Sequence, residues 1–230
     1  MLETYTIYLV NQSSNTQKYW CFLAGPDDAG VYANSTASLA VRPNDPGLNF
    51  FTILTQYIVG AGASNHAVKV GARIVVSAPI VAAASSVTHD AALGDMWDAN
   101  YATWPPNEGP SLNLSGTKSP SETIAIRSNA FNKVVNENND WFSNMSFGIQ
   151  SESGFIGMTW SPNPQEIRAV TPRLHFYLVS GNYGSNVVAS FDDVSNTSAS
   201  IKVPSDFIHN KCTVTHTEIG EWLVTPGEPS

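Results

Sequence analysis

Residues 4–10 read Thr-Tyr-Thr-Ile-Tyr-Leu-Val, a β-branched and aromatic run that is followed by Asn-Gln-Ser-Ser-Asn at 11–15. A second run, Lys-Tyr-Trp-Cys-Phe-Leu, occupies residues 18–23. Two such runs on either side of a polar turn predict a β-hairpin. Similar runs, punctuated by Asn, Ser, Gly and Pro, recur as far as 174–179 and 221–224. The sequence therefore predicts an all-β protein.

No shift of composition marks a linker, so we expect residues 1–230 to form one antiparallel β-sandwich of the jelly-roll or immunoglobulin-like kind. Residues 67–80 are predicted to form a long strand with Gly71 as a bulge. The regularity ends between about 82 and 120, where several Pro and Gly residues exclude a continuous strand. We expect this segment to be one long inserted loop, aromatic and acidic, that is ordered and covers one end of the sandwich.

Charge excludes several kinds of partner. Only 13% of the 230 residues are charged and the net charge is −8, with 11 Lys plus Arg and no basic cluster. Nucleic acids and anionic membranes attract Lys and Arg, so we expect neither as a partner. The N-terminus carries no pattern of a secretory signal, and the longest apolar stretch, 74–87, is too short to span a bilayer. These features predict a cytoplasmic protein.

The two cysteines, Cys21 and Cys212, lie near opposite ends of the chain. In a cytosolic protein we expect both to be reduced thiols in the core. If the protein is secreted by another route, a disulfide between them remains an alternative.

The long loop holds the first group of candidate catalytic residues. His89 and Asp90 are adjacent, Asp95 and Asp98 follow, and no Lys or Arg occurs between residues 74 and 117. Such a segment could cover a pocket and offer His89 or an aspartate as a general base. The alternative is a solvated acidic loop.

A second group lies on one predicted strand. Arg173, His175 and Tyr177 alternate along it, so their side chains are expected on one face, with Leu174 and Phe176 on the other. A cation, an imidazole and a phenol in one row could hold an anionic or carbonyl-bearing substrate and donate a proton. The alternative is that these residues form the solvent-exposed outer face of a sandwich.

Aromatic residues form the third group, because they could line an apolar or sugar-stacking cavity. The candidate ligand-binding residues are Trp97, Tyr101, Trp104, Trp141 and Trp160. The alternative for each is core packing, although Trp97 and Trp104 fall outside the predicted strands.

Other chemistries lack a pattern. The spacing of Asp95, Asp98 and His89 matches neither a zinc site nor an EF-hand, so no metal is predicted. The alternative is a calcium ion bound in a loop. No G-x-S-x-G elbow occurs, and the glycines at 60 and 62 lack the third glycine and the lysine of phosphate-binding loops. We therefore expect no cofactor.

Two segments carry a family resemblance. Residues 5–13 leading into Tyr-Trp-Cys-Phe at 19–22, and Ser-Phe-Gly-Ile at 146–149 leading to the strand at 173–179, resemble the rhizosphere-induced protein (RhiA-like) family. The resemblance covers most of the chain outside 82–120. It implies a β-sandwich, and it carries no catalytic residue over to this chain because the family has no settled activity.

We expect the protein to bind a small, largely apolar organic molecule in a pocket under the long loop. Any reaction would be a cofactor-free cyclisation, isomerisation or pericyclic step of natural-product biosynthesis, which needs shape and exclusion of water rather than a motif. The alternative is a non-enzymatic protein, either lectin-like or self-assembling, and a homo-oligomer fits either function.

Overall fold

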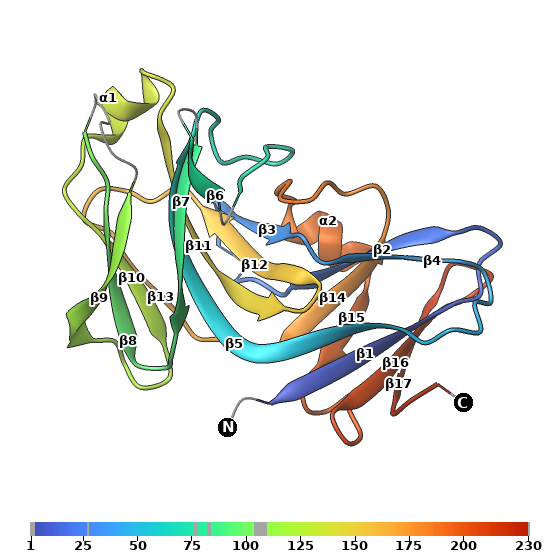
Figure 1. The fold of residues 1–230 in the computed structure, drawn as a ribbon. Coiled ribbons are helices and arrows are strands. Elements are labelled where there is room, and N and C mark those ends of the chain that lie inside the picture. Colours follow the sequence, from blue (N-terminus) through green and yellow to red (C-terminus); the bar gives the residue numbers. More distant parts are fainter. Residues whose placement is uncertain (1–2, 27, 76–77, 82–83, 104–109, 230) are drawn as a thin grey trace.

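The computed structural model describes residues 3–26, 28–75, 78–81, 84–103 and 110–229. It confirms an all-β protein, in which three curled sheets are joined by loops and two short helices (Figure 1). The helices are α1 (Lys133–Glu137) and α2 (Phe191–Asn196).

The main sheet has the strand order β17-β16-β1-β5-β11-β12-β3, with β7 also paired to β5 and β6 paired to β7. Its strands are β1 (Thr4–Asn11), β3 (Val31–Ser35), β5 (Asn49–Ser64), β6 (Ala78–Val81), β7 (Ala84–Ala91), β11 (Phe142–Ser151), β12 (Gly154–Trp160), β16 (Lys211–His216) and β17 (Trp222–Pro226).

The second sheet has the order β15-β14-β2-β4 and the third sheet the order β13-β10-β8-β9. The second sheet contains β2 (Gln17–Leu23), β4 (Ser38–Val41), β14 (His175–Ser180) and β15 (Ala199–Lys202). The third sheet contains β8 (Asp95–Asn100), β9 (Ser111–Lys118), β10 (Ile124–Ser128) and β13 (Ile167–Val170).

The long strand β5 links the two ends of the molecule (Figure 1). Its first part pairs with β1 and its second part pairs with β7, while β11 lies along its other edge. Small residues in β5 permit its neighbours to pack closely on it, because a Cβ atom at Gly60 would lie 2.3 Å from the Ser146 hydroxyl oxygen. Close approach of the neighbouring strands therefore depends on the Gly-Ala-Gly-Ala run at 60–63.

One large hydrophobic cluster takes in residues of all three sheets, such as Phe51, Phe176 and Ile124. Strand β2 is buried on both faces. Tyr19 and Cys21 face this cluster, whereas Trp20 and Phe22 point the other way into a second cluster that contains Val194 of α2. Successive side chains of a strand point to opposite faces, which explains why these four residues divide between the two clusters.

Three sequence predictions were wrong in detail. The strands at 4–11 and 17–23 exist, but they do not pair as a hairpin: β1 pairs with β5 and β16, and β2 pairs with β14 and β4. Two strand pairs, β1 with β16 and β8 with β10, are parallel rather than antiparallel. The predicted strand at 67–80 is irregular over 65–75, where Gly71 has a φ of 82°.

The expectation of one long loop at 82–120 was also wrong. Its described residues form β7, which pairs with β5, and β8 and β9, which belong to the third sheet. Pairing with β10 and β5 supplies partners for the backbone groups of these strands, so weak intrinsic strand propensity is overridden by tertiary contacts.

Candidate functional site

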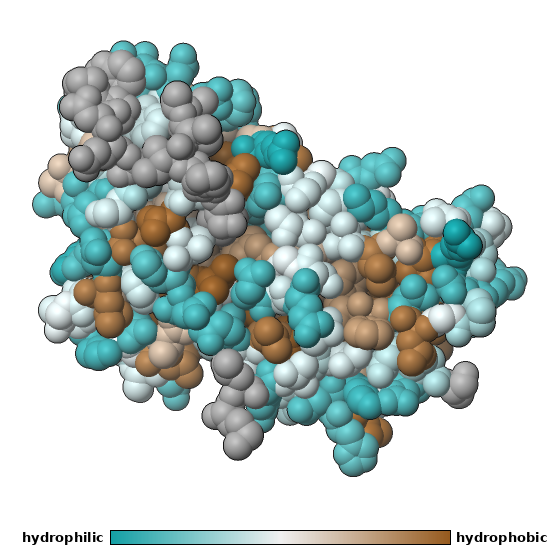
Figure 2. Space-filling model, in the orientation of Figure 1, coloured by the Kyte–Doolittle hydropathy of each residue, from teal (hydrophilic) through white to brown (hydrophobic). Residues whose placement is uncertain are grey.

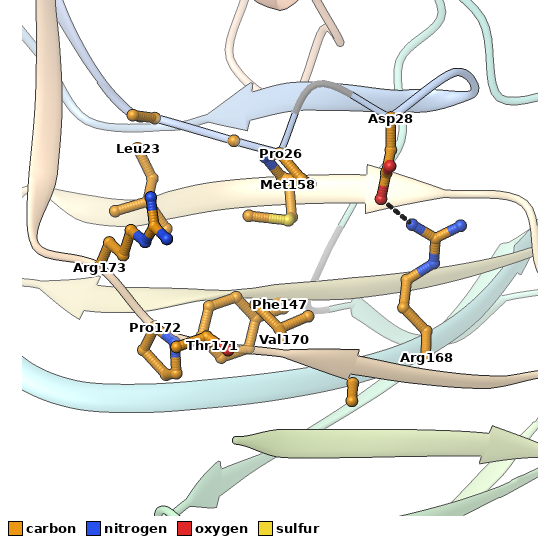
Figure 3. Close-up of a pocket in the computed structure, with 13 residues that line it drawn as sticks. Leu23, Pro26, Asp28, Phe147, Met158, Arg168, Val170, Thr171, Pro172 and Arg173 are labelled. Carbon is orange, nitrogen blue, oxygen red and sulfur yellow. Dashed lines mark hydrogen bonds and ion pairs between the residues drawn. The ribbon is translucent and has the colours of Figure 1, made fainter. Parts of the chain in front are cut away.

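A cavity of about 310 Å³ lies between the main sheet, the third sheet and the loop that follows β2. We call it the β13 cavity (Figure 3). Its floor is apolar, with Phe147 of β11 and Met158 of β12, which are paired in the main sheet. The described residues of the lining are Leu23, Ala24, Gly25, Pro26, Asp28, Phe147, Met158, Arg168, Ala169, Val170, Thr171, Pro172 and Arg173.

The floor is part of the hydrophobic core. Phe147 and Met158 are almost fully buried, and the Phe147 ring stacks on Tyr57 with centroids 5.9 Å apart. On the opposite side, the loop at 24–26 is fixed by close contact of Gly25 with the Phe191 ring of α2. The cavity therefore lies between a packed sheet and a loop that is held at its first turn.

One end of the cavity carries a satisfied cation. The Arg168 Nη1 atom lies 3.2 Å from Asp28 Oδ2, and its Nε lies 3.3 Å from Glu166 Oε1. The guanidinium also lies over the Trp160 ring, 5.3 Å from its centroid. Arg168 thus joins strand β13 to the loop after β2 across the cavity, as Figure 3 shows for its pair with Asp28.

The other end carries Arg173, whose side chain is exposed and has no ion-pair partner among the described residues. In Figure 3, Arg173 and the Asp28–Arg168 pair flank Met158 and Phe147 from opposite sides. The cavity therefore combines an apolar floor with a free guanidinium at its margin.

Of the predicted catalytic residues, only Arg173 lines this cavity. His175 and Tyr177 are brought together, with ring centroids 4.9 Å apart, but outside the lining. His175 Nε2 lies 2.8 Å from the hydroxyl of Ser200, a partner that sequence reasoning missed because it lies on the neighbouring strand β15. Burial, together with the charge of Lys202, lowers the pKa of His175 although Asp206 opposes this.

A serine hydroxyl beside a histidine ring, as in the His175–Ser200 pair, is also found in enzymes that use serine as a nucleophile. Ser200 is exposed. It lines neither the β13 cavity nor any other pocket found among the described residues. Nucleophilic catalysis needs a substrate pocket and an oriented base as well as the hydroxyl. We therefore interpret the pair as a cross-strand contact of the second sheet.

His89 and Asp90 lie on β7 and are exposed. The His89 ring stacks on Trp97 of β8, with centroids 5.1 Å apart and an angle of 11° between the planes. Trp97 is itself buried in the main cluster, so this pair joins the main sheet to the third sheet. Neither residue lines the β13 cavity.

The remaining aromatic candidates are distributed through the structure. Tyr101 is buried and donates its hydroxyl hydrogen to the Asn144 carbonyl at 2.7 Å, and burial raises its pKa. Trp160 is buried beneath Arg168, and Trp141 follows α1 with partial exposure. Trp104 lies outside the described residues. Core packing therefore accounts for Trp97, Tyr101 and Trp160.

Both cysteines are buried free thiols. Burial raises the pKa of Cys21, and it raises the pKa of Cys212 to about 12. Over the described part of the chain, no cluster of three or more His, Cys, Asp or Glu residues is arranged to hold a metal ion. Within the same residues, no helix has the length and apolar character needed to cross a membrane.

Figure 2 shows hydrophobic residues on one face of the molecule as separate patches divided by hydrophilic ones. Outside the grey residues, the visible face therefore carries its apolar side chains in several patches.

Compared with models of protein families, with curated proteins and with solved structures, the chain matches none. The resemblance to the RhiA-like family therefore stays a prediction, and functional inference depends on the geometry of the site.

Proposed function

We propose that the protein binds a small, largely apolar organic molecule in the β13 cavity. The observation that carries this proposal is the cavity of about 310 Å³ over the buried Phe147 and Met158. Small-molecule sites are typically concave, mostly apolar and of about 300–1,000 Å³. At about 30 Å³ for each water-sized group, the volume suits a ligand of about ten non-hydrogen atoms.

Binding is better supported than catalysis. Among the described residues, the charged groups of the lining are two guanidiniums and one carboxylate, and the Asp28 carboxylate is already paired with Arg168. A guanidinium stays protonated in proteins, so neither arginine is a general base. A cofactor-free cyclisation or isomerisation after binding stays a proposal, as do the jelly-roll or immunoglobulin-like class of the sandwich, a cytoplasmic location and a homo-oligomeric state.

The test is calorimetric titration of the protein with 1-octanol, a neutral probe of about ten non-hydrogen atoms. We expect saturable binding that Val170→Phe weakens at least tenfold, since Val170 lines the cavity and a larger side chain fills it. The matched control is Val134→Phe, because Val134 is 67% exposed on α1, outside the β13 cavity.

A second measurement protects the test from a folding defect in Val170→Phe. In the wild-type protein, the NMR methyl signals of Met158 and Val170 should shift on titration, while that of the exposed Val134 should not. Absence of saturable binding, or equal shifts at all three methyl groups, would refute the proposal.

A further inference from the structure

Arg173 differs from Arg168 in having its charge unmatched. Among the described residues, these two side chains are the only cations that line the β13 cavity. Arg168 contacts Asp28 and Glu166, whereas Arg173 has no acidic partner there. Arg173 is therefore a cation without a described carboxylate partner in a protein whose net charge is −8. An anion at this margin would meet a guanidinium that no described carboxylate neutralises.

The strand edge adds a second donor on the same wall. Ser128 N donates to the Glu166 carbonyl at 2.9 Å, and the β10–β13 register continues unshifted from this pair. In an antiparallel ladder, hydrogen-bonded and non-hydrogen-bonded pairs alternate, so Ala169, opposite Ala125, directs its N–H and C=O away from β10. Ala169 lines the cavity, and β13 is an edge strand of the third sheet.

We infer that the ligand of the β13 cavity carries a carboxylate group and that the Arg173 guanidinium binds it. The apolar part of the ligand then lies over Phe147 and Met158, and the Ala169 N–H is available as an uncharged donor beside it. This inference deepens the proposed function and rests on it. It assigns the ligand to the class of small amphipathic carboxylic acids.

The chemistry of arginine supports a carboxylate in particular. A guanidinium presents its N–H groups in a planar fork that matches the two oxygen atoms of a carboxylate, and such charge-assisted bonds are among the strongest in proteins. Arg173 follows Pro172, whose ring fixes its own φ, so the backbone that presents the guanidinium is restrained. Asp28 does not compete for Arg173, because its carboxylate is held by Arg168.

The experiment compares three probes of similar size at pH 7: octanoate, 1-octanol and octylammonium. In the wild-type protein we expect octanoate to bind at least tenfold more tightly than 1-octanol, and octylammonium to bind most weakly. Arg173→Gln should remove the advantage of octanoate over 1-octanol, while Arg173→Lys should keep part of this advantage. The advantage should also shrink as salt is raised, because the guanidinium is exposed.

The control variant is Arg42→Gln, since Arg42 is another exposed arginine and does not line the cavity. It should leave all three affinities unchanged. Equal binding of octanoate and 1-octanol, or a preference for octanoate that survives Arg173→Gln, would overturn the inference and leave the proposed function standing. If 1-octanol shows no saturable binding, the proposed function fails, and the inference that rests on it fails as well.

Discussion

Gly25 offers a direct test of what holds the loop at 24–26 in place over the β13 cavity. A Cβ atom at this position would lie 2.1 Å from Phe191 Cζ and 2.3 Å from Cε2, far inside van der Waals contact. Gly25 is not among the glycines with positive φ, so alanine suits the backbone and only the collision matters. In Gly25→Ala, either the Phe191 ring rotates out of its contacts or the loop at 24–26 lifts from α2.

Overpacking of this kind costs about 1–3 kcal/mol, and we expect the free energy of unfolding to fall by that amount. A double-mutant cycle identifies the cause. In a Phe191→Ala background the colliding ring is absent, so Gly25→Ala should cost less than about 0.5 kcal/mol, within the range of neutral surface substitutions. Urea unfolding of the four proteins of the cycle measures the coupling.

The control is Gly116→Ala in β9, where a Cβ atom would have no heavy atom within 4 Å. It should change the stability by less than about 1 kcal/mol, in the stabilising direction, because alanine restricts the unfolded chain. If Gly25→Ala costs the same with and without the Phe191 ring, the proposed contact does not hold the loop, and the reasoning is refuted.

Two other substitutions test the core and the pH response. Gly157→Ala would place Cβ 2.3 Å from the Phe147 carbonyl oxygen and 2.7 Å from Gly148 Cα, and because backbone atoms cannot rotate away we expect a loss of about 3 kcal/mol or more on urea unfolding; a loss below about 1 kcal/mol would contradict the packing described. Burial lowers the pKa of His216 below its ordinary 6.5, so the unfolded state binds more protons, and stability should fall as pH drops from about 7 through 6.5 to the folded-state pKa, by at most about 1.4 kcal/mol per pH unit. His216→Phe should lose this part of the slope, and identical slopes for the two proteins would show that His216 is not its source.

The strands that could be predicted from the sequence are those whose local composition already favours extended structure. The runs at 4–10, 18–23 and 174–179 are dense in β-branched and aromatic residues, and each forms a strand. β8 and β9 have weak runs, Asp-Met-Trp-Asp-Ala-Asn and Ser-Leu-Asn-Leu-Ser-Gly-Thr-Lys, and they become strands through pairing in the third sheet. Pairing partners far apart in the chain leave no local signal.

The same reason explains why most of the candidate site was missed. The cavity is lined by residues 23–28, by Phe147 and Met158, and by 168–173, which come together only after the sheets form. Trp97 and Trp160 were predicted as ligand-binding residues because they are aromatic, yet both are buried in the core. Arg173 was predicted because of its alternation with His175 and Tyr177, but it lies at the cavity for a different reason, since it precedes β14 and follows the edge strand β13.

The β13 cavity opens to solvent at its margin, where Asp28, Ala169 and Arg173 are exposed. We therefore expect water to occupy it when no ligand is bound, and Arg168, Arg173 and the free edge at Ala169 are groups that hold water. The same groups then favour a ligand that replaces this water with its own acceptors, while its apolar part covers Phe147 and Met158. An apolar ligand without an anionic group would cover the floor but leave the Arg173 guanidinium with water alone, which is why we expect the head group, rather than the apolar chain, to decide which molecules bind.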